Sequence, residues 1–273
     1  MATDGLLQLH TLRNGAPGTM PLVLLHGFPL DHRMWLDVTD LLAGDPTVLA
    51  PDLPGFGVSP TGPDVAQTVG GAEPSIEVMA DGVAATLEAS GVERAVVAGL
   101  SMGGYVAMAL AERHPGLVAG LALLDTKSTA DAAEVSARRL EIAGTLEAEN
   151  TIEAVLVMRS TLLGASNRTA RPDLVERLEA WIRDQGAPAV AWAQRAMAVR
   201  PDRTGALAAF VGPAVVVVGE QDELSPLDVA RHMAASLQDA ELVVVPGSGH
   251  MTTIENPEPV AVALTALLGR VGG

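Results

Sequence analysis

Cysteine is absent from the 273 residues of this chain, so disulfide bonds and thiolate chemistry are both excluded. Long apolar runs are absent as well, because no stretch approaches the roughly 18 residues that a membrane-spanning helix requires. The first residues contain neither the basic segment nor the apolar core of a secretion signal. From these absences we expect a soluble, cytoplasmic protein that does not bind membranes.

Positive charge is scarce, because 17 lysine and arginine residues stand against 33 aspartate and glutamate residues, for a net charge of −16. Such an acidic surface opposes the binding of nucleic acids and anionic membranes. The imbalance is uneven along the chain. Residues 127–205 hold 11 basic and 11 acidic residues, so the whole negative excess lies outside them. This difference indicates an inserted segment within an acidic body.

Hydrophobic residues make up 48% of the chain, which is enough for one large buried sheet with an insertion. Alternating polarity over residues 6–13 predicts an edge strand. Four amphipathic patterns with no strand-like run between them predict helices over residues 131–149, 151–163, 172–185 and 188–199. We therefore assign residues 1–126 and 206–273 to an α/β core and residues 127–205 to a helical cap.

The pattern G-x-S-x-G occurs at residues 99–103, between an apolar run suited to a buried strand and a run of helix-forming residues. In this strand-to-helix setting the pattern is typical of a nucleophile elbow, with Ser101 on the sharp turn. Gly99 and Gly103 are small enough to let the strand and the helix approach each other. The alternative is a packing turn whose serine has no chemical role, so the partners of a catalytic serine must also be present.

A catalytic serine needs a base, and His250 is the candidate because it stands at the tip of a glycine-rich loop after a β-branched run. A carboxylate must in turn orient the imidazole and stabilise its charged form. Asp222 follows the valine-rich run 215–218, whereas Asp125 follows another apolar run and remains the competing candidate. We favour the chain order Ser101, Asp222, His250, with each residue at the end of a predicted strand.

Two backbone N–H groups have to stabilise the negative oxygen that develops during acyl transfer. Met102 follows the serine at a helix N-terminus, where free N–H groups favour an anion. The second donor is expected from Phe28, in a loop after the apolar run 22–25 where Gly27 allows a close backbone approach. His26 in the same loop is expected to hold the loop rather than to act as a second base.

Five segments in this order resemble the α/β-hydrolase fold family, in particular its bacterial carboxylesterases and enol-lactonases: residues 26–30, 51–57, 99–104, 219–222 and 247–250. The similarity extends from about residue 5 to residue 268. It implies an α/β fold with an eight-stranded, mostly parallel sheet, helices on both faces and a helical cap inserted after the sixth strand. Related epoxide hydrolases and haloalkane dehalogenases have aspartate as the nucleophile, so Ser101 argues against both activities.

These residues predict a bacterial serine esterase, a carboxylesterase that cleaves small neutral carboxylic esters through an acyl-enzyme on Ser101. No metal or organic cofactor is required, and no ligand cluster for one is evident in the sequence. Phe28, Met102, Trp192 and Met251 are expected to contact the small-molecule ester or lactone substrate. They are apolar, and no charge clamp stands beside the triad, which favours a neutral acyl group.

Other activities are compatible with the same side chains. A lactonase acting on N-acyl homoserine lactones or enol-lactones would differ only in the shape of its pocket. A perhydrolase would let peroxide replace water on the acyl-enzyme, and an ester of acyl carrier protein would need a basic docking face on the cap. A non-catalytic small-molecule receptor is disfavoured, because every catalytic role has a candidate residue.

Overall fold

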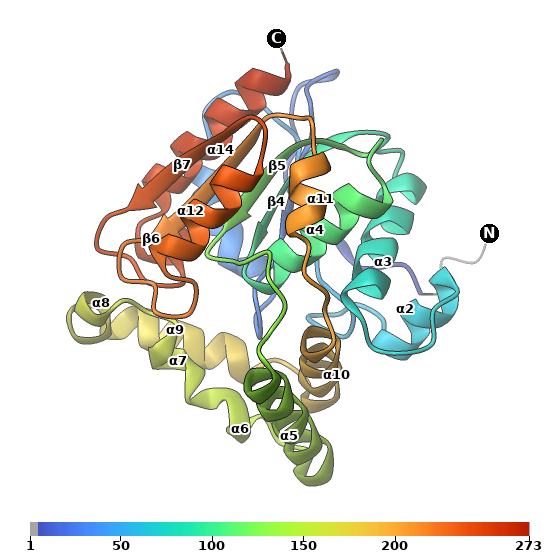
Figure 1. Cartoon of the computed structure of the whole chain (residues 1–273), viewed down its shortest axis with the longest axis vertical. Helices are drawn as coiled ribbons and strands as arrows, with labels where there is room; N and C mark the ends of the chain where they lie inside the picture. The colour runs from blue at the N-terminus through green and yellow to red at the C-terminus, as the bar shows by residue number, and fades with distance from the viewer. Residues whose placement is uncertain (1–4, 273) are drawn as a thin grey trace.

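A twisted sheet covered by helices on both faces forms the body of the computed structural model, which describes residues 5–272 (Figure 1). Residues 1–4 and 273, which the sequence analysis assigns to the core, lie outside the described residues. The sheet has the strand order β1-β3-β2-β4-β5-β6-β7. Its strands are β1 (Leu9–Arg13), β2 (Leu22–Leu25), β3 (Val48–Pro51), β4 (Ala95–Leu100), β5 (Val118–Leu124), β6 (Ala214–Gly219) and β7 (Ala240–Val245).

The central strands are buried along their whole length, which explains their composition. Strands β4, β5 and β6 are apolar runs without an exposed position, as expected for parallel strands covered on both faces. At one edge β1 pairs antiparallel with β3, and at the other edge β7 pairs parallel with β6. The predicted α/β fold with a mostly parallel sheet is confirmed.

The described residues form seven strands, so the predicted count of eight was wrong. The edge strand predicted over residues 6–13 begins only at Leu9. Just before it, the N–H of Leu7 donates to Thr86 Oγ1 and the N–H of Gln8 donates to Ser59 Oγ, both at 2.9 Å. Side-chain hydroxyls therefore satisfy these two N–H groups, and β1 is shorter at its start than predicted.

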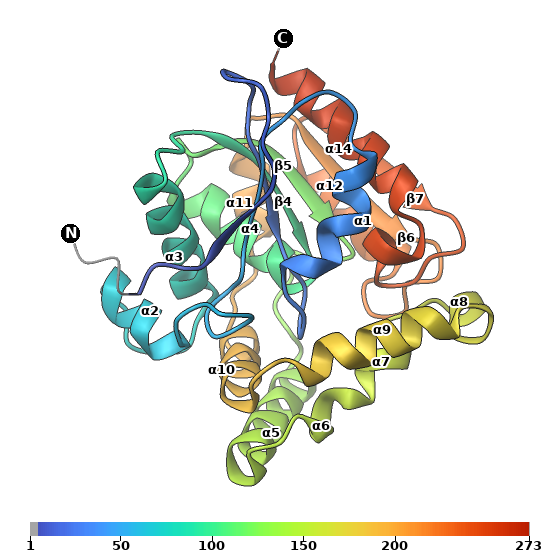
Figure 2. The same ribbon diagram turned by 180° about the vertical axis from the view of Figure 1, so that it is seen from behind.

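Helices cover both faces of this sheet. Helices α3, α4, α11 and α12 lie on one face, and α1 and α14 lie on the other (Figures 1 and 2). No helix within residues 5–272 is both long and apolar enough to cross a membrane. The helices outside the inserted segment are η1 (His32–Trp35), α1 (Leu36–Leu41), α2 (Gly62–Val69), α3 (Ile76–Ala89), α4 (Met102–Arg113), α11 (Thr204–Ala209), α12 (Leu227–Ser236), α13 (Thr252–Glu255) and α14 (Pro257–Val271).

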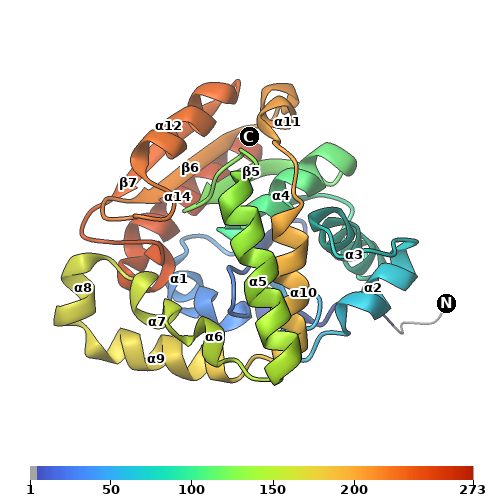
Figure 3. The same cartoon turned by 60° about the horizontal axis from the view of Figure 1, so that its bottom comes forward.

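Between β5 and β6 the chain leaves the sheet and forms seven helices. The first six, α5 to α10, we call the inserted helices, whereas α11 packs on α4 and α12 of the body. The inserted helices gather beyond one end of the sheet, at the bottom of Figure 1 and in front in Figure 3. Helix α5 packs along α10, and α7 and α8 pack on α9. The inserted helices are α5 (Ala133–Glu149), α6 (Glu153–Leu156), α7 (Met158–Thr161), α8 (Ala165–Ala170), α9 (Pro172–Arg183) and α10 (Ala187–Ala198).

Two details of this segment differ from the sequence prediction. The helix predicted over residues 151–163 is broken at Val157 into α6 and α7. At the break, Arg159 Nη1 donates to the carbonyl oxygen of Leu156 at 3.1 Å, so a side chain replaces a backbone donor. Helix α8 was not predicted, because residues 165–170 are mostly polar and show no apolar periodicity.

Buried ion pairs fasten the two ends of the inserted segment to each other. Asp131, just before α5, accepts from Arg200 Nη1 at 2.6 Å and from Arg139 Nε at 2.7 Å. The Asp131 and Arg200 side chains are only 1% and 2% exposed. The Arg200 guanidinium also lies 4.1 Å from the ring centroid of Tyr105 on α4. The inserted helices are thus held against the helix that follows Ser101.

We predict that Arg200→Ala lowers the free energy of unfolding by about 3–5 kcal/mol, because it removes one partner of a buried ion pair. Arg195→Ala is the matched control, since Arg195 pairs with Glu147 while both side chains are exposed, and it should cost less than about 1 kcal/mol. Urea unfolding of the full chain measures both values. Equal losses for the two variants would contradict a structural role of the buried pair.

Candidate active site

Ser101 occupies a strained turn between β4 and α4. Its φ of 52° and ψ of −111° lie where a residue with a side chain is rarely found. The turn is held because the N–H of Ser101 donates to the carbonyl oxygen of Leu124, at the end of the neighbouring strand β5, at 2.9 Å. The geometry raises the serine side chain above the carboxyl end of the sheet.

Close packing around this turn requires small residues on both sides of the serine. A Cβ atom at Gly99 would lie 2.1 Å from the carbonyl oxygen of Gly103. A Cβ atom at Gly103 would lie 2.2 Å from the carbonyl oxygen of Leu25, in strand β2. Any larger residue at either position would push α4 away from the sheet. Steric contact therefore explains why the motif has glycine at both positions.

The side chains of Ser101, His250 and Asp222 form one hydrogen-bonded chain. His250 Nε2 lies 2.8 Å from Ser101 Oγ, and His250 Nδ1 lies 2.8 Å from Asp222 Oδ2. Asp222 follows β6 and His250 follows β7, so parallel strands bring both to the end of the sheet where Ser101 stands. An imidazole between a hydroxyl and a carboxylate can accept the hydroxyl proton while the carboxylate stabilises the resulting charge.

The surroundings of Asp222 keep its carboxyl ionised. Burial opposes its charge, but His250 and the N–H groups of Leu224 and Ser225, at 2.8 and 3.0 Å, lower its pKa below the ordinary value. Burial likewise disfavours the charged form of His250, yet the Asp222 carboxylate raises its pKa above the ordinary histidine value. The Asp222 carboxylate therefore stabilises the positive charge that His250 acquires when it accepts a proton.

Asp125, the competing acid of the sequence analysis, has different partners. Its Oδ1 accepts the N–H of Gly219 at 2.9 Å, and Thr252 Oγ1 donates to its Oδ2 at 2.5 Å. Complete burial, together with the charge of Asp222, raises the pKa of Asp125 well above its usual range. The contacts of Asp125 tie the turn after β6 to the start of α13, and Asp222 is the carboxylate that hydrogen-bonds His250.

The loop after β2 lies against the serine. A Cβ atom at Gly27 would lie 3.7 Å from Ser101 Cβ and only 3.0 Å from Leu100 Cδ2, so the backbone passes close to the serine and a side chain here would crowd Leu100. The N–H of Gly27 points away and donates to Met34 Sδ at 3.1 Å. The next residue is Phe28, and Met102 begins α4 on the other side of the serine. Both backbones thus border the space above Ser101.

His26 in the same loop has a structural contact. Its Nε2 accepts the N–H of Leu53 at 2.8 Å, which joins the loop after β2 to the loop after β3. The side chain is fully buried, and burial lowers its pKa below the ordinary histidine value. Neutral His26 can therefore serve as an acceptor for a backbone N–H at this position.

The remaining predicted contact residues lie in two different places. Met251 directly follows His250 and Met102 directly follows Ser101, and both are buried, as is Phe28 in the loop after β2. Trp192 lies on α10 with its indole ring against Gly62, the first residue of α2, where a Cβ would lie 2.3 Å from the ring. The indole thus fills space between the inserted helices and α2.

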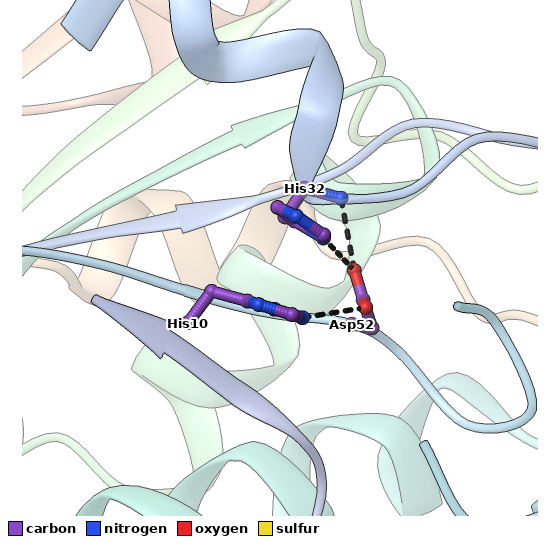
Figure 4. Close-up of side chains that lie close together, drawn as sticks. All are labelled: His10, His32 and Asp52. Atoms are coloured by element: carbon purple, nitrogen blue, oxygen red, sulfur yellow. Dashed lines mark hydrogen bonds and ion pairs between the residues drawn. The ribbon is translucent and has the colours of Figure 1, made fainter. Parts of the chain in front are cut away.

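One group of side chains has the composition of a metal site: His10, His32 and Asp52, whose ligand atoms lie within 4.8 Å of one another. Figure 4 shows both imidazoles directed at the same carboxylate, His10 Nε2 to Oδ2 and His32 Nδ1 to Oδ1, each at 2.9 Å. The rings are stacked at 3.5 Å and 16°, so their lone pairs lie in nearly parallel planes and do not converge on one point. The geometry fits hydrogen bonding better than ligation of one ion.

This cluster braces the region beside the candidate site. Asp52 also accepts the backbone N–H of His32 at 2.9 Å, which fixes the start of η1 four residues after Phe28. Burial opposes its charge, but the contacts with His32 lower the pKa of Asp52 to about 2. The sequence analysis missed the cluster, because His10 and His32 lie 42 and 20 residues from Asp52 and only the folded sheet brings them together.

Comparison with known proteins agrees with the observed topology. A family model described as alpha/beta hydrolase fold matches residues 20–257. The pimeloyl-[acyl-carrier protein] methyl ester esterase of Aromatoleum aromaticum is 29% identical over 253 residues, which cover 89% of this chain and 96% of that protein. The 2-succinyl-6-hydroxy-2,4-cyclohexadiene-1-carboxylate synthase of an Enterobacter species is 33% identical over 264 residues, 94% of each chain.

Solved structures show the same similarity. A thermophilic esterase from Thermogutta terrifontis has a TM-score of 0.89 at 33% identity, over 98% of this chain and 94% of that one. The enol-lactonase from Burkholderia xenovorans has a TM-score of 0.81 at 23% identity, over 98% and 99% of the two chains, which supports the fold alone. The sheet, the strained serine turn and these matches together show that the chain belongs to the α/β-hydrolase fold family, and that esterases are among its relatives.

Proposed function

We propose that this protein is a serine hydrolase that cleaves small neutral carboxylic esters through an acyl-enzyme on Ser101. The observation that carries the proposal is the chain of hydrogen bonds from Ser101 Oγ through His250 to Asp222, with both links at 2.8 Å. Similarity to the Thermogutta terrifontis esterase at 33% identity supports the same class of reaction. Ser101 is the nucleophile, His250 the general base and Asp222 the residue that orients the base.

In the acylation step, Ser101 Oγ attacks the ester carbonyl carbon and passes its proton to His250 Nε2. Asp222 holds the opposite nitrogen, which fixes the tautomer and stabilises the imidazolium. The N–H groups of Phe28 and Met102 bind the developing oxyanion, and the N-terminus of α4 adds a favourable dipole at Met102.

In the following steps, His250 returns its proton to the leaving alcohol, and the carbon–oxygen bond to that alcohol breaks. Water then attacks the acyl-enzyme while His250 again takes a proton, and collapse of the second tetrahedral intermediate releases the carboxylic acid and free Ser101. The atoms balance with ester and water as substrates and acid and alcohol as products.

We further propose that residues 127–205 act as a cap over a core made of the residues before 127 and after 205. Burial of Phe28, Met102 and Met251 near the triad supports an apolar lining of the substrate site. The ring of Trp192 packs against Gly62. We propose that Trp192 thereby fixes the position of α2 and so contributes to the shape of the site.

The charges of the inserted segment favour a neutral substrate. Ten of its eleven basic side chains form ion pairs with carboxylates of the protein. The eleventh, Arg138, is exposed on α5. A substrate carboxylate would therefore have to displace an existing partner before it could pair with an arginine of these helices.

A second candidate is the hydrolysis of a methyl ester on an acyl chain carried by a protein. It is favoured by the 29% identity with the protein named pimeloyl-[acyl-carrier protein] methyl ester esterase. The ester itself would be neutral and would fit the proposed chemistry. An acidic carrier, however, would need free basic residues at its docking face, and the paired arginines of the inserted helices offer few. Lactone hydrolysis would use the same residues and differ in the shape of the pocket.

Ser101→Ala should reduce ester hydrolysis by about 10⁴-fold or more while the fold remains intact, because the nucleophile is lost. Steady-state assays with p-nitrophenyl acetate, together with circular dichroism, measure activity and fold. Residual activity within tenfold of the parent, after contaminating esterases have been excluded, would end the serine-hydrolase proposal.

Asp222→Asn should lower kcat by about 10³–10⁴-fold, because an amide favours the wrong tautomer of His250. Asp125→Asn should stay within about tenfold of the parent, because Asp125 hydrogen-bonds Gly219 and Thr252 and not His250. Parallel measurements of kcat for the two variants compare these roles. If Asp125→Asn lowered kcat more than Asp222→Asn, the acid that orients His250 would be Asp125, at the end of β5.

For neutral esters, kcat/KM should rise with acyl length until the site is full, since each buried CH₂ contributes about 0.8 kcal/mol. A matched ester with a terminal carboxylate should be a poorer substrate, because the net charge of −16 repels it and the arginines are paired. A series of p-nitrophenyl esters, one carboxylated ester and a set of lactones tests this selectivity. Preference for the carboxylated ester would indicate an arginine that reaches the substrate. Preference for lactones would show that the protein is a lactonase and not an esterase.

A further inference from the structure

The loop that carries His250 is fastened by a buried carboxylate that the sequence analysis did not single out. Glu255, the last residue of α13, is 8% exposed. Its Oε1 accepts the N–H of Gly249 at 2.8 Å and the N–H of Met251 at 3.2 Å. These are the residues directly before and after His250, so one oxygen holds the backbone on both sides of the imidazole.

The other oxygen of the same carboxylate reaches the inserted helices. Glu255 Oε2 accepts the N–H of Gly164 at 2.8 Å and Asn167 Nδ2 at 2.7 Å. The same amide group of Asn167 donates to the carbonyl oxygen of Gly247 at 2.9 Å. Glu255 therefore joins the His250 loop to the segment 162–167, which connects α7 with α8 and begins α8.

The two loops also touch directly. The N–H of His250 donates to the carbonyl oxygen of Leu162 at 3.0 Å. A Cβ atom at Gly249 would lie 2.2 Å from the nitrogen of Gly164, so no side chain fits between the two backbones. Because the contact is backbone to backbone, a shift of the segment 162–167 must displace the loop that holds the base.

Charge gives Glu255 a second influence on the base. Among the described residues, its hydrogen-bond donors are three backbone N–H groups and a side-chain amide, all of them neutral. Burial lowers the pKa of His250, whereas three carboxylates around it raise that pKa: Asp222 after β6, Asp125 after β5 and Glu255 on α13. Of these, Glu255 is the one that also contacts the inserted helices.

We propose that Glu255 is a positioning residue for His250 and that it couples the docking of the segment 162–167 to the placement of the base. The inference rests on the proposed function in one respect, namely that His250 is the base. Docking of the inserted helices and completion of the catalytic side chains are then one event, because the same carboxylate bridges both loops. An undocked segment 162–167 leaves His250 without its backbone acceptor at Leu162.

Glu255→Gln tests this coupling, because glutamine keeps the shape but loses the charge and can direct its oxygen at only part of the four donors. We expect kcat to fall by about tenfold to hundredfold through displacement of the base. His250 must be neutral to accept the proton, so kcat/KM falls as the pH drops through its pKa. Removing a nearby negative charge lowers that pKa, and the acid limb should therefore move to lower pH.

Glu220→Gln is the matched control. Glu220 is exposed and accepts the N–H of Gly247, in the same loop, at 3.0 Å. The substitution removes an equal charge and a comparable hydrogen bond but leaves the contacts with Gly249, Met251 and the segment 162–167 in place. We expect kcat and the acid limb of this variant to stay at the parental values. Identical behaviour of the two variants would overturn the proposal.

One measurement that needs no turnover separates this inference from the proposed function. Titration of the His250 imidazole by NMR should show a lower pKa in Glu255→Gln than in the parent. If the parent protein has no esterase activity but the His250 pKa is still lower in Glu255→Gln than in the parent, the proposed function is refuted and the coupling stands. An unchanged His250 pKa in an active enzyme would refute the coupling alone.

Should Glu255→Gln fail to fold, Asn167→Ala keeps the coupling testable. This variant removes the side-chain contact between the inserted segment and both Glu255 and Gly247. We expect amide hydrogen exchange to accelerate at Gly164 and at His250 together, because one docking equilibrium protects both. Arg168→Ala, which removes an ion pair with Glu223, serves as the control. Faster exchange at Gly164 with an unchanged rate at His250 would contradict the proposal.

Discussion

Strands β4 to β7 run side by side in the same direction, and their parallel pairing places the ends of all four at one edge of the sheet. The pairing register aligns the last residues of neighbouring strands: Leu100 pairs with Leu124, and Gly219 pairs with Val245. Ser101, Asp222 and His250 follow the ends of β4, β6 and β7 within a few residues. A slip of one residue in either pairing would turn the buried side chains to the other face and separate the site residues.

Three carboxylates near His250 have different chemical roles because their surroundings differ. Asp222 faces the imidazole and two N–H groups, which keep it ionised. Asp125 lies close by but is fully buried near another negative charge, which raises its pKa well above the usual range. Glu255 has only neutral donors around it and acts on backbone groups. Three acidic side chains thus meet one histidine, and each interacts with it differently.

Much of this arrangement could be predicted from the sequence, because local patterns encode it. Continuous valine and leucine runs predicted buried parallel strands, and the glycines around Ser101 predicted a sharp turn between strand and helix. Asp222 and His250 could be placed at strand ends, but the distances between them depend on strand order, which is a property of the whole sheet. The start of the first strand was predicted too early, because the hydroxyls of Thr86 and Ser59 accept the N–H groups of Leu7 and Gln8.

Features created by tertiary contacts could not be predicted. The stacked imidazoles of His10 and His32 meet only because β1 lies beside β3, and the break at Val157 depends on the arginine that caps Leu156. Glu255 looked like an ordinary polar residue before a helix, because its partners in the segment 162–167 lie about 90 residues away, 91 in the case of Gly164.

The contact of Gly164 with Gly249 bears on how such a protein can diversify. Where two backbones touch, neither chain can accept a side chain without opening the interface, so this short stretch is closed to variation. Helices α5, α6, α9 and α10 carry no such restriction toward the His250 loop. Exchanges of residues or even of whole turns there would leave the Gly164–Gly249 contact in place. The inserted helices thus combine one closely packed backbone contact with a larger region where substitutions leave that contact undisturbed.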